Sequence, residues 1–482
     1  MPATPPRRLR PSTLPSTLPS TLLRTLGAAL VALLVAALLT SPGSLTSRAQ
    51  QPLHLVKDTL PSGNPATPGN FTGYGFDQCQ APSQAAMDAW LRASPYLATG
   101  IYIAGASRGC RNQTNLSAGW VSTQLAKGWK LLPITLGPQA SCNPRFPRYG
   151  NDPVISAATT NGVYATAAAQ GKAEADKAVG VARWLGIVPG STMYYDLEAF
   201  DAGNTKCRNS ALTFLSSWTT EIKALGYLSG VYSSASSGLK MLDQVRQTNP
   251  TAYALPDQVW IADWNNQANT SSSYVSSTGW MPHARVKQYQ GGHNERYGGV
   301  TINIDRDFLD VGQGSVAPGE SHCNGVPVSF SSYKVLKQPA SGTKVSAGLK
   351  PYVKALKCLL TERGGYTKKV NARFSRPLAA AVRSWRAAHG FGAGSATWNK
   401  HLWLSLFASN ARPVLKYGSA SPAVRDLQRA MAVSQPSLHL PITGVYDGAT
   451  QRAVTAYQKA HKIKHHGIVA GTTWSALAAG KR

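Results

Sequence analysis

The residues best placed to do chemistry are Asp196 and Glu198, which lie one residue apart at the end of an apolar, β-prone run that begins at Thr192. Side chains alternate along a β-strand, so both carboxylates would lie on one face, with Tyr195 and Leu197 on the other. Two acids that share a face repel each other, and their pKa values are pushed apart. A protonated acid beside a carboxylate suits general acid/base chemistry. The pattern therefore favours a catalytic role for this pair.

More acids occur at or near the ends of other β-prone runs, namely Asp77, Asp263 and Asp305. Aromatic and amide residues lie among them: Tyr102, Tyr195, Tyr232, Trp260, Trp264, Tyr289, Gln288 and Gln290. Rings can stack on sugar faces, while acids and amides bind hydroxyl groups. The set predicts a carbohydrate cleft. For Asp305 and Asp307, which flank Arg306, an alternative is that they only cap helices or pair with arginine.

Eight β-prone runs would have to position these residues: Thr72–Asp77, Thr99–Gly105, Lys130–Leu136, Thr192–Glu198, Tyr227–Ser233, Gln258–Trp264, Arg285–Gln290 and Thr301–Phe308. Helical stretches lie between several of them: Gln84–Ala93, Ala167–Leu185 and Ser210–Leu225. This alternation over residues 71–315 predicts an α/β fold, a (β/α)8 barrel, with its site at the carboxyl ends of the strands. A doubly wound open sheet is the alternative, but no G-x-G-x-x-G or phosphate loop opens a helix here.

Residues 1–49 have the pattern of an export signal. Four arginines, Arg7, Arg8, Arg10 and Arg24, precede the apolar run Leu26–Leu39, and Ser47-Arg48-Ala49 offers a cleavage site. The run is short for a bilayer span, so we expect cleavage, a linker at residues 50–70 and no stable membrane span. Whether export uses a general or a twin-arginine route stays open.

Six cysteines in an exported chain favour disulfides. Sequence alone does not determine the pairing, but we favour Cys79–Cys110, Cys142–Cys207 and Cys323–Cys358. No two cysteines have C-x-x-C spacing, which argues against a zinc or redox site. His461, His465 and His466 alternate with lysines and indicate a solvated basic face. We expect no metal and no cofactor.

The charge is concentrated in the last third of the chain. Residues 316–482 contain 24 basic and 4 acidic residues, whereas residues 71–315 contain 19 and 16, out of a total net charge of +28. A basic tail on an exported protein points to an anionic surface. Because no nucleic-acid motif is present, we expect anionic cell-wall polymers and not nucleic acid.

The same tail contains an internal repeat. After a linker at residues 316–350, the run Val353–Leu360 aligns with Val424–Met431, and Trp403 and Leu406 align with Trp474 and Leu477. Spacing that holds within one residue over three helices indicates a repeated module. We expect two small all-α three-helix modules, at residues 351–410 and 411–482, with their aromatics in the cores.

The second copy resembles the three-helix peptidoglycan-binding domain. The matching stretches are Val424–Gln428, Gly444–Gly448, Tyr457-Gln458 and Thr473–Leu477. The first copy is degenerate, since it lacks the Asp-Gly turn after its first helix and has Cys358 inside that helix. The resemblance implies binding to peptidoglycan.

Residues 71–312 resemble the actinobacterial glycoside-hydrolase-like family, which is related to the family-25 lysozymes. The matching stretches are Gly73–Asp77, Tyr194–Phe200, Gly230–Ser234, Val259–Trp264, Lys287–Gly292 and Ile302–Asp307. The resemblance implies a (β/α)8 barrel in which Glu198 is the general acid and Asp196 stabilises developing positive charge or orients the substrate. Asp77 and Asp305 would complete the acidic floor.

The sequence thus predicts a secreted, cell-wall-associated hydrolase that cleaves β-1,4 bonds of peptidoglycan. Asp263, Tyr102, Tyr195, Tyr232, Trp260, Trp264, Gln288 and Gln290 are the predicted substrate-binding residues. Two alternatives stay open: a non-catalytic glycan-binding or wall-organising protein, and a hydrolase of another exported polysaccharide.

Overall fold

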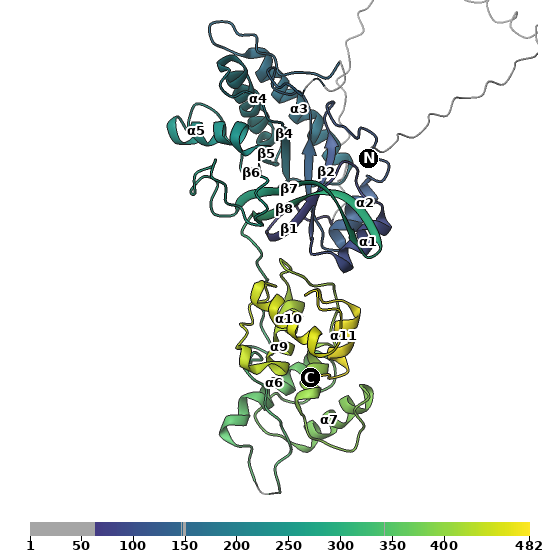
Figure 1. Cartoon of the computed structure of the whole chain (residues 1–482). Coiled ribbons are helices and arrows are strands. Elements are labelled where there is room, and N and C mark those ends of the chain that lie inside the picture. The colour runs from purple at the N-terminus through teal and green to yellow at the C-terminus, as the bar shows by residue number, and fades with distance from the viewer. Residues whose placement is uncertain (1–62, 146, 148–150, 342) are drawn as a thin grey trace, which may run out of the picture. The chain divides into compact units, whose positions relative to one another are not determined.

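The computed structural model describes residues 63–482, apart from residues 146, 148–150 and 342. The predicted signal peptide at residues 1–49, and the predicted linker up to residue 62, lie outside the described residues. Within the described part of the chain, no helix is long and apolar enough to cross a membrane. In Figure 1, strands alternate with helices in the N-terminal part of the described chain, and the elements that follow β8 are helices joined by loops.

Eight strands form one closed barrel in sequential order. Their bounds are β1 Phe71–Asp77, β2 Ala98–Ala104, β3 Lys130–Thr135, β4 Thr192–Leu197, β5 Leu228–Ser234, β6 Gln258–Ala262, β7 Ala284–Tyr297 and β8 Val300–Val311. Each coincides with a predicted run, which confirms the α/β barrel and contradicts the open-sheet alternative. The difference is largest at β7, which continues well beyond the predicted end at Gln290.

Five α-helices follow the first five strands: α1 Gln84–Ala93, α2 Ala118–Ala126, α3 Ala165–Trp184, α4 Thr205–Ala224 and α5 Lys240–Thr248. A π-helix at Ala235–Leu239 leads into α5. Three of these helices begin at a side-chain cap, since Ser83, Ser117 and Asn204 each accept a hydrogen bond from a first-turn amide. Buried aromatic residues on α1 and α4, such as Trp90 and Trp218, pack against the strands.

The barrel departs from a regular strand–helix repeat at its last two strands. Strand β8 forms a hairpin with β7 and is antiparallel to both β7 and β1. The register places Asp305 opposite Asp77. Because β8 is antiparallel, a residue in its first half reaches the barrel end where the parallel strands have their carboxyl ends. This explains how Asp305 can join acids that lie at strand ends.

The segment at residues 263–283, between β6 and β7, contains no helix and is anchored by two buried cations of β7. Arg285 donates from Nε to the Gly279 carbonyl at 2.6 Å and also donates to the Ser276 carbonyl. Lys287 donates from Nζ to Asn269 Oδ1 at 2.7 Å and to the Ser271 carbonyl at 2.8 Å. These contacts replace the packing that a helix would supply.

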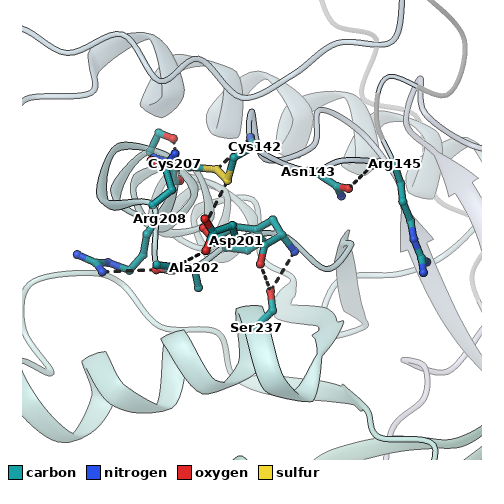
Figure 2. Close-up of a disulfide and its surroundings, with 12 residues drawn as sticks. Cys142, Asn143, Arg145, Asp201, Ala202, Cys207, Arg208 and Ser237 are labelled. Carbon is teal, nitrogen blue, oxygen red and sulfur yellow. Dashed lines mark hydrogen bonds between the residues drawn. A yellow bond between two sulfur atoms is a disulfide. The ribbon is translucent and has the colours of Figure 1, made fainter.

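All three predicted disulfides are confirmed: Cys79–Cys110, Cys142–Cys207 and Cys323–Cys358. The second joins the segment after β3 to the first turn of α4 (Figure 2). Beside it, Ser237 accepts a hydrogen bond from the Phe200 amide and donates to the Phe200 carbonyl. Together these contacts hold the segment that follows β4.

The C-terminal region contains two successive sets of three α-helices, as the repeat predicts. The first set is α6 Lys350–Glu362, α7 Arg376–Ala388 and α8 Lys400–Phe407. The second is α9 Pro422–Ser434, α10 Gly448–Ala460 and α11 Gly471–Ala478. Short 3-10 helices lie before α6, at Ala347–Leu349, and between α9 and α10, at Pro436–Leu438. Trp403 and Trp474, at equivalent repeat positions, are both buried. Side chains of both sets form one hydrophobic cluster, so the two copies share a core.

Candidate active site

A cleft of about 350 Å³ lies at the barrel end where β1, β2 and β4 finish. Its lining includes the acids Asp77, Glu198 and Asp305, the rings of Tyr102 and Trp264, and the cation Arg108. The volume is at the lower end of the range for small-molecule and sugar-sized sites. The predicted acids of β1, β4 and β8 are therefore brought to one place.

Asp196 and Glu198 have the placement that strand alternation predicts. Asp196 lies within β4 and is buried, whereas Glu198 follows the last residue of the strand and lines the cleft. Tyr102 donates from its hydroxyl to Asp196 Oδ2 at 3.4 Å. Asp196 thus lies deeper than Glu198, on the same side of the strand.

Gln139, which sequence reasoning missed, holds the end of β4. Its Nε2 donates to the Asp196 carbonyl at 2.8 Å, and its Oε1 accepts from the Glu198 amide at 2.8 Å. The side chain is fully buried. One amide therefore fixes the backbone that carries both acids. No local pattern reveals this role, because Gln139 lies in the segment after β3.

Gln288 connects three residues that line the cleft, Asp77, Asp305 and Trp264, with Tyr232 behind them through one side chain. Its Nε2 donates to Asp77 Oδ2 at 2.8 Å and to Asp305 Oδ2 at 3.2 Å. Its Oε1 accepts from the Tyr232 hydroxyl at 3.0 Å and from Trp264 Nε1 at 2.8 Å. An amide keeps the same donors and acceptors at every pH. We infer that this predicted substrate-binding residue positions the acids and the rings.

Burial and mutual repulsion raise the proton affinity of the acidic floor. Burial, with the nearby charge of Asp305, raises the pKa of Asp77 well above its usual value. Burial raises the pKa of Asp305 to about 6, with His293 opposing the rise and Glu198 adding to it. These are the two ways in which active sites keep carboxyl groups protonated near neutral pH.

Asp307 belongs to this floor, although the sequence left open a simple pairing with Arg306. It is fully buried and accepts a hydrogen bond from Trp260 Nε1 at 2.9 Å. Burial, followed by the charges of Asp77 and Asp305, raises its pKa well above the usual value. Arg306 instead donates to Glu295 and to Gln290 Oε1. Alternation along β8 put Asp305 and Asp307 on one face, and that was the available signal.

The predicted aromatic residues divide into cleft and support positions. Tyr102 and Trp264 line the cleft, and the Trp264 side chain is 63% exposed. The Trp264 ring lies directly on Gly291, where an added Cβ would come within 2.6 Å of it. Trp260 is buried, makes an edge contact with Tyr232 and supports Asp307 from below. An exposed indole packed against a glycine is a suitable platform for a sugar ring.

Six of the eight predicted substrate-binding residues are not among the residues that line the cleft. Gln288, Tyr232 and Trp260 belong to the hydrogen-bond network of the acidic floor. The other three are Tyr195, Gln290 and Asp263. Tyr195 is fully buried between β4 and α4, with its ring against Phe214 and Trp218. Gln290 accepts from Arg306. Asp263 is half-exposed just after β6. Tyr195 lies outside the barrel because Asp196 and Glu198 face inward and alternate residues must face outward.

The structure holds one group of potential metal ligands among the described residues, at Cys323, Cys358 and Glu362. Its two cysteines are joined in a disulfide, so they offer no thiolate to a metal. This group therefore does not fit a metal centre.

The fold and the cleft together define a barrel protein of the glycoside hydrolase-like class. Residues 88–309 match the model of the Rv2525c-like, glycoside hydrolase-like domain, and residues 420–477 match that of the putative peptidoglycan-binding domain. The chain therefore contains an Rv2525c-like glycoside hydrolase-like domain and a C-terminal peptidoglycan-binding domain, which confirms both resemblances. Asp77 lies outside the range matched by the glycoside hydrolase-like model, which begins at residue 88.

Three solved structures match about half of this chain. An uncharacterized B. stearothermophilus protein is 18% identical, with a TM-score of 0.31, over 49% of this chain and 95% of its own. The Mycobacterium tuberculosis Tat-secreted protein Rv2525c in complex with L-tartrate is 13% identical, with a TM-score of 0.33, over 49% and 95%. The structure of the same protein in complex with HEPES is 13% identical, with a TM-score of 0.33, over 50% of this chain and 97% of its own. A search of curated proteins finds no match.

Proposed function

We propose that this protein is a secreted glycoside hydrolase that cleaves β-1,4 bonds of peptidoglycan and is held on the cell wall by its C-terminal modules. The observation that carries the proposal is the convergence of Asp77, Glu198 and Asp305 on one cleft. A hydrolase-like barrel and a peptidoglycan-binding domain on the same chain support peptidoglycan as the substrate. The disulfides support an extracellular location.

In the proposed mechanism, Glu198 protonates the oxygen of the scissile bond. Of Asp196 and Glu198, only Glu198 is among the described residues that line the cleft. Glu198 can therefore reach a bound glycan. Asp196, deeper in the barrel, supplies negative charge that stabilises an oxocarbenium-like transition state or orients the substrate. Asp77 and Asp305 form the floor, and Gln288 sets their positions. Trp264 offers its exposed ring to a neighbouring sugar.

The test is release of reducing ends from purified peptidoglycan. Wild type is expected to release them and Glu198→Gln to lose activity by about 100-fold or more, since general acid catalysis contributes about 10²–10⁴-fold. Glu221→Gln is the matched control, because Glu221 lies on α4 and pairs with Lys172 at 2.8 Å. Equal release by wild type and Glu198→Gln would sink the catalytic assignment. Wall binding without any release would instead favour the non-catalytic alternative.

A further inference from the structure

The cleft contains one cation, Arg108, among the described residues that line it. Arg108 lies in the segment that follows β2, two residues before Cys110. Asp77, Glu198 and Asp305 line the same cleft. The proposed mechanism assigns no role to this guanidinium.

The Arg108 side chain is held in place by its own backbone segment. Its Nε donates to the Gly105 carbonyl at 2.9 Å and its Nη1 donates to the Tyr102 carbonyl at 3.2 Å. The segment is tied to the end of β1 by the Cys79–Cys110 disulfide. Gln113 adds hydrogen bonds from Nε2 to the carbonyls of Cys79 and Cys110. A guanidinium fixed in this way is pre-organised and loses little entropy when it binds a ligand.

Within the described residues, Arg108 donates to these two carbonyls and pairs with no carboxylate. Burial, with the charge of Arg111, lowers its pKa from the ordinary value of 12.5. A half-buried cation without an anion is costly, because desolvation is not repaid by a charge pair. An anionic group on a bound ligand would repay it through a charge-assisted hydrogen bond.

We propose that Arg108 binds a carboxylate carried by the substrate, next to the bond that the acids attack. This rests on the proposed function and deepens it, since it names the substrate class as a glycan with a carboxylate substituent on a sugar. The lactyl ether of a muramyl residue that lacks its peptide has this chemistry. A singly charged group suits the site better than a phosphate dianion, because three acids line the same cleft and repel a second negative charge more strongly.

The test compares two probes on the full chain in a Glu198→Gln background, which prevents turnover. One is a muramyl tetrasaccharide with free lactyl carboxylates and the other is its methyl ester. Isothermal titration should show the free acid binding about tenfold more tightly, as expected for one charge-assisted hydrogen bond. Adding Arg108→Gln should abolish the preference, and Arg108→Lys should keep part of it. The modules of the tail are the same in all proteins, so any preference that they add is constant, and only the part of the preference that Arg108→Gln removes is assigned to the cleft.

Arg111→Gln is the matched control, because it removes a cation from the same segment that is not among the cleft residues. This variant should keep the preference for the free acid. Equal Kd values for the acid and the ester would overturn the carboxylate site, even if peptidoglycan is still cleaved. A preference for the free acid in the Glu198→Gln background, together with no release of reducing ends by the wild-type protein, would overturn the hydrolase and support the carboxylate site. A chain that binds neither probe would contradict both.

Discussion

The acids of the cleft hold their protons with different strength, and the causes lie in single residues. Asp77 and Asp307 are almost wholly buried, which disfavours their charged forms. Asp305 is less buried and has a pKa of about 6. A Gln288 amide, which does not titrate, donates to both Asp77 and Asp305. The floor therefore changes charge near neutral pH while its geometry is held constant.

Asp305→Asn is expected to make folding stability less dependent on pH between about 4 and 6. The pKa of Asp305 in the folded chain, about 6, lies above the ordinary 3.8, so the folded chain binds this proton more tightly. The stability from this group is present below pH 4 and is lost as pH rises through 6. Asparagine does not titrate, so the variant lacks this loss. Its free energy of unfolding, relative to that of the wild type, should be about 1–3 kcal/mol higher at pH 7 than at pH 4.

Urea unfolding of wild type and variant at pH 4, 5, 6 and 7 measures this effect. Asp88→Asn is an informative control of opposite sign. Despite partial burial, hydrogen bonds from Lys127 and Gln84 lower the pKa of Asp88. Its replacement should therefore cost more at pH 7 than at pH 4. A pH dependence of Asp305→Asn that matches wild type would contradict the assignment.

At the scale of elements, the last two strands determine what the cleft contains. The antiparallel course of β8 brings Asp305 level with Asp77. The segment at residues 263–283 takes the place of a helix and begins with the residues around Trp264. The buried cations Arg285 and Lys287 anchor it through hydrogen bonds from β7. The position of the exposed indole thus depends on contacts that lie outside the cleft.

Lys287→Met is expected to loosen this segment and weaken glycan binding while the barrel stays folded. The change removes three hydrogen-bond donors that serve Asn265, Asn269 and Ser271. It should destabilise the chain by about 1–3 kcal/mol, because the hydrogen bonds that a buried charged group makes to this segment are lost. Limited proteolysis with mass spectrometry would show new cuts within residues 263–283. Lys223→Met, at an exposed pair with Asp257, is the control and should show none. Identical digestion of the two variants would rule out an anchoring role.

At the scale of the whole molecule, the excess of positive charge is in the C-terminal residues. Residues 316–482 have 24 basic and 4 acidic residues. Clustered positive charge attracts anionic polymers over a distance that the salt concentration sets. The peptidoglycan-binding domain lies in this part of the chain. We propose that anionic wall polymers bind here in addition to peptidoglycan.

Replacing Lys459, Lys462 and Lys464 with glutamine should weaken wall binding at low salt and flatten its salt dependence. All three lysines are exposed, so their loss should change charge and not folding. Sedimentation of the full chain with purified walls, from about 0.05 to 0.5 M salt, covers Debye lengths from well above to well below 10 Å. Glutamine at Lys172, Lys177 and Lys223 of the barrel is the matched control. Salt-insensitive binding by the wild type would favour a groove that recognises glycan by shape.

Much of the fold and part of the site could be predicted from local patterns. The eight strands and the two helix triplets follow from periodicity and spacing, and the structure confirms them. The export signal predicted disulfides but did not determine their pairing, and the structure confirms the three pairs that we favoured. Asp196 and Glu198 could be placed on one face by alternation. The same rule placed Tyr195 on the opposite face, and its proposed contact with substrate conflicts with that rule.

The sequence by itself determined the elements and the chemical character of the chain, because hydrophobic period, capping residues and charge are properties of neighbouring residues. Only the tertiary structure decided which groups meet in the cleft. Gln288 contacts Asp77, which is 211 positions away, and Gln139 holds the backbone of Asp196. Arg108 lines the cleft, and the Cys79–Cys110 disulfide ties its segment to the residues that follow β1. Such contacts depend on barrel closure and on the antiparallel register of β8, and no local pattern encodes either one.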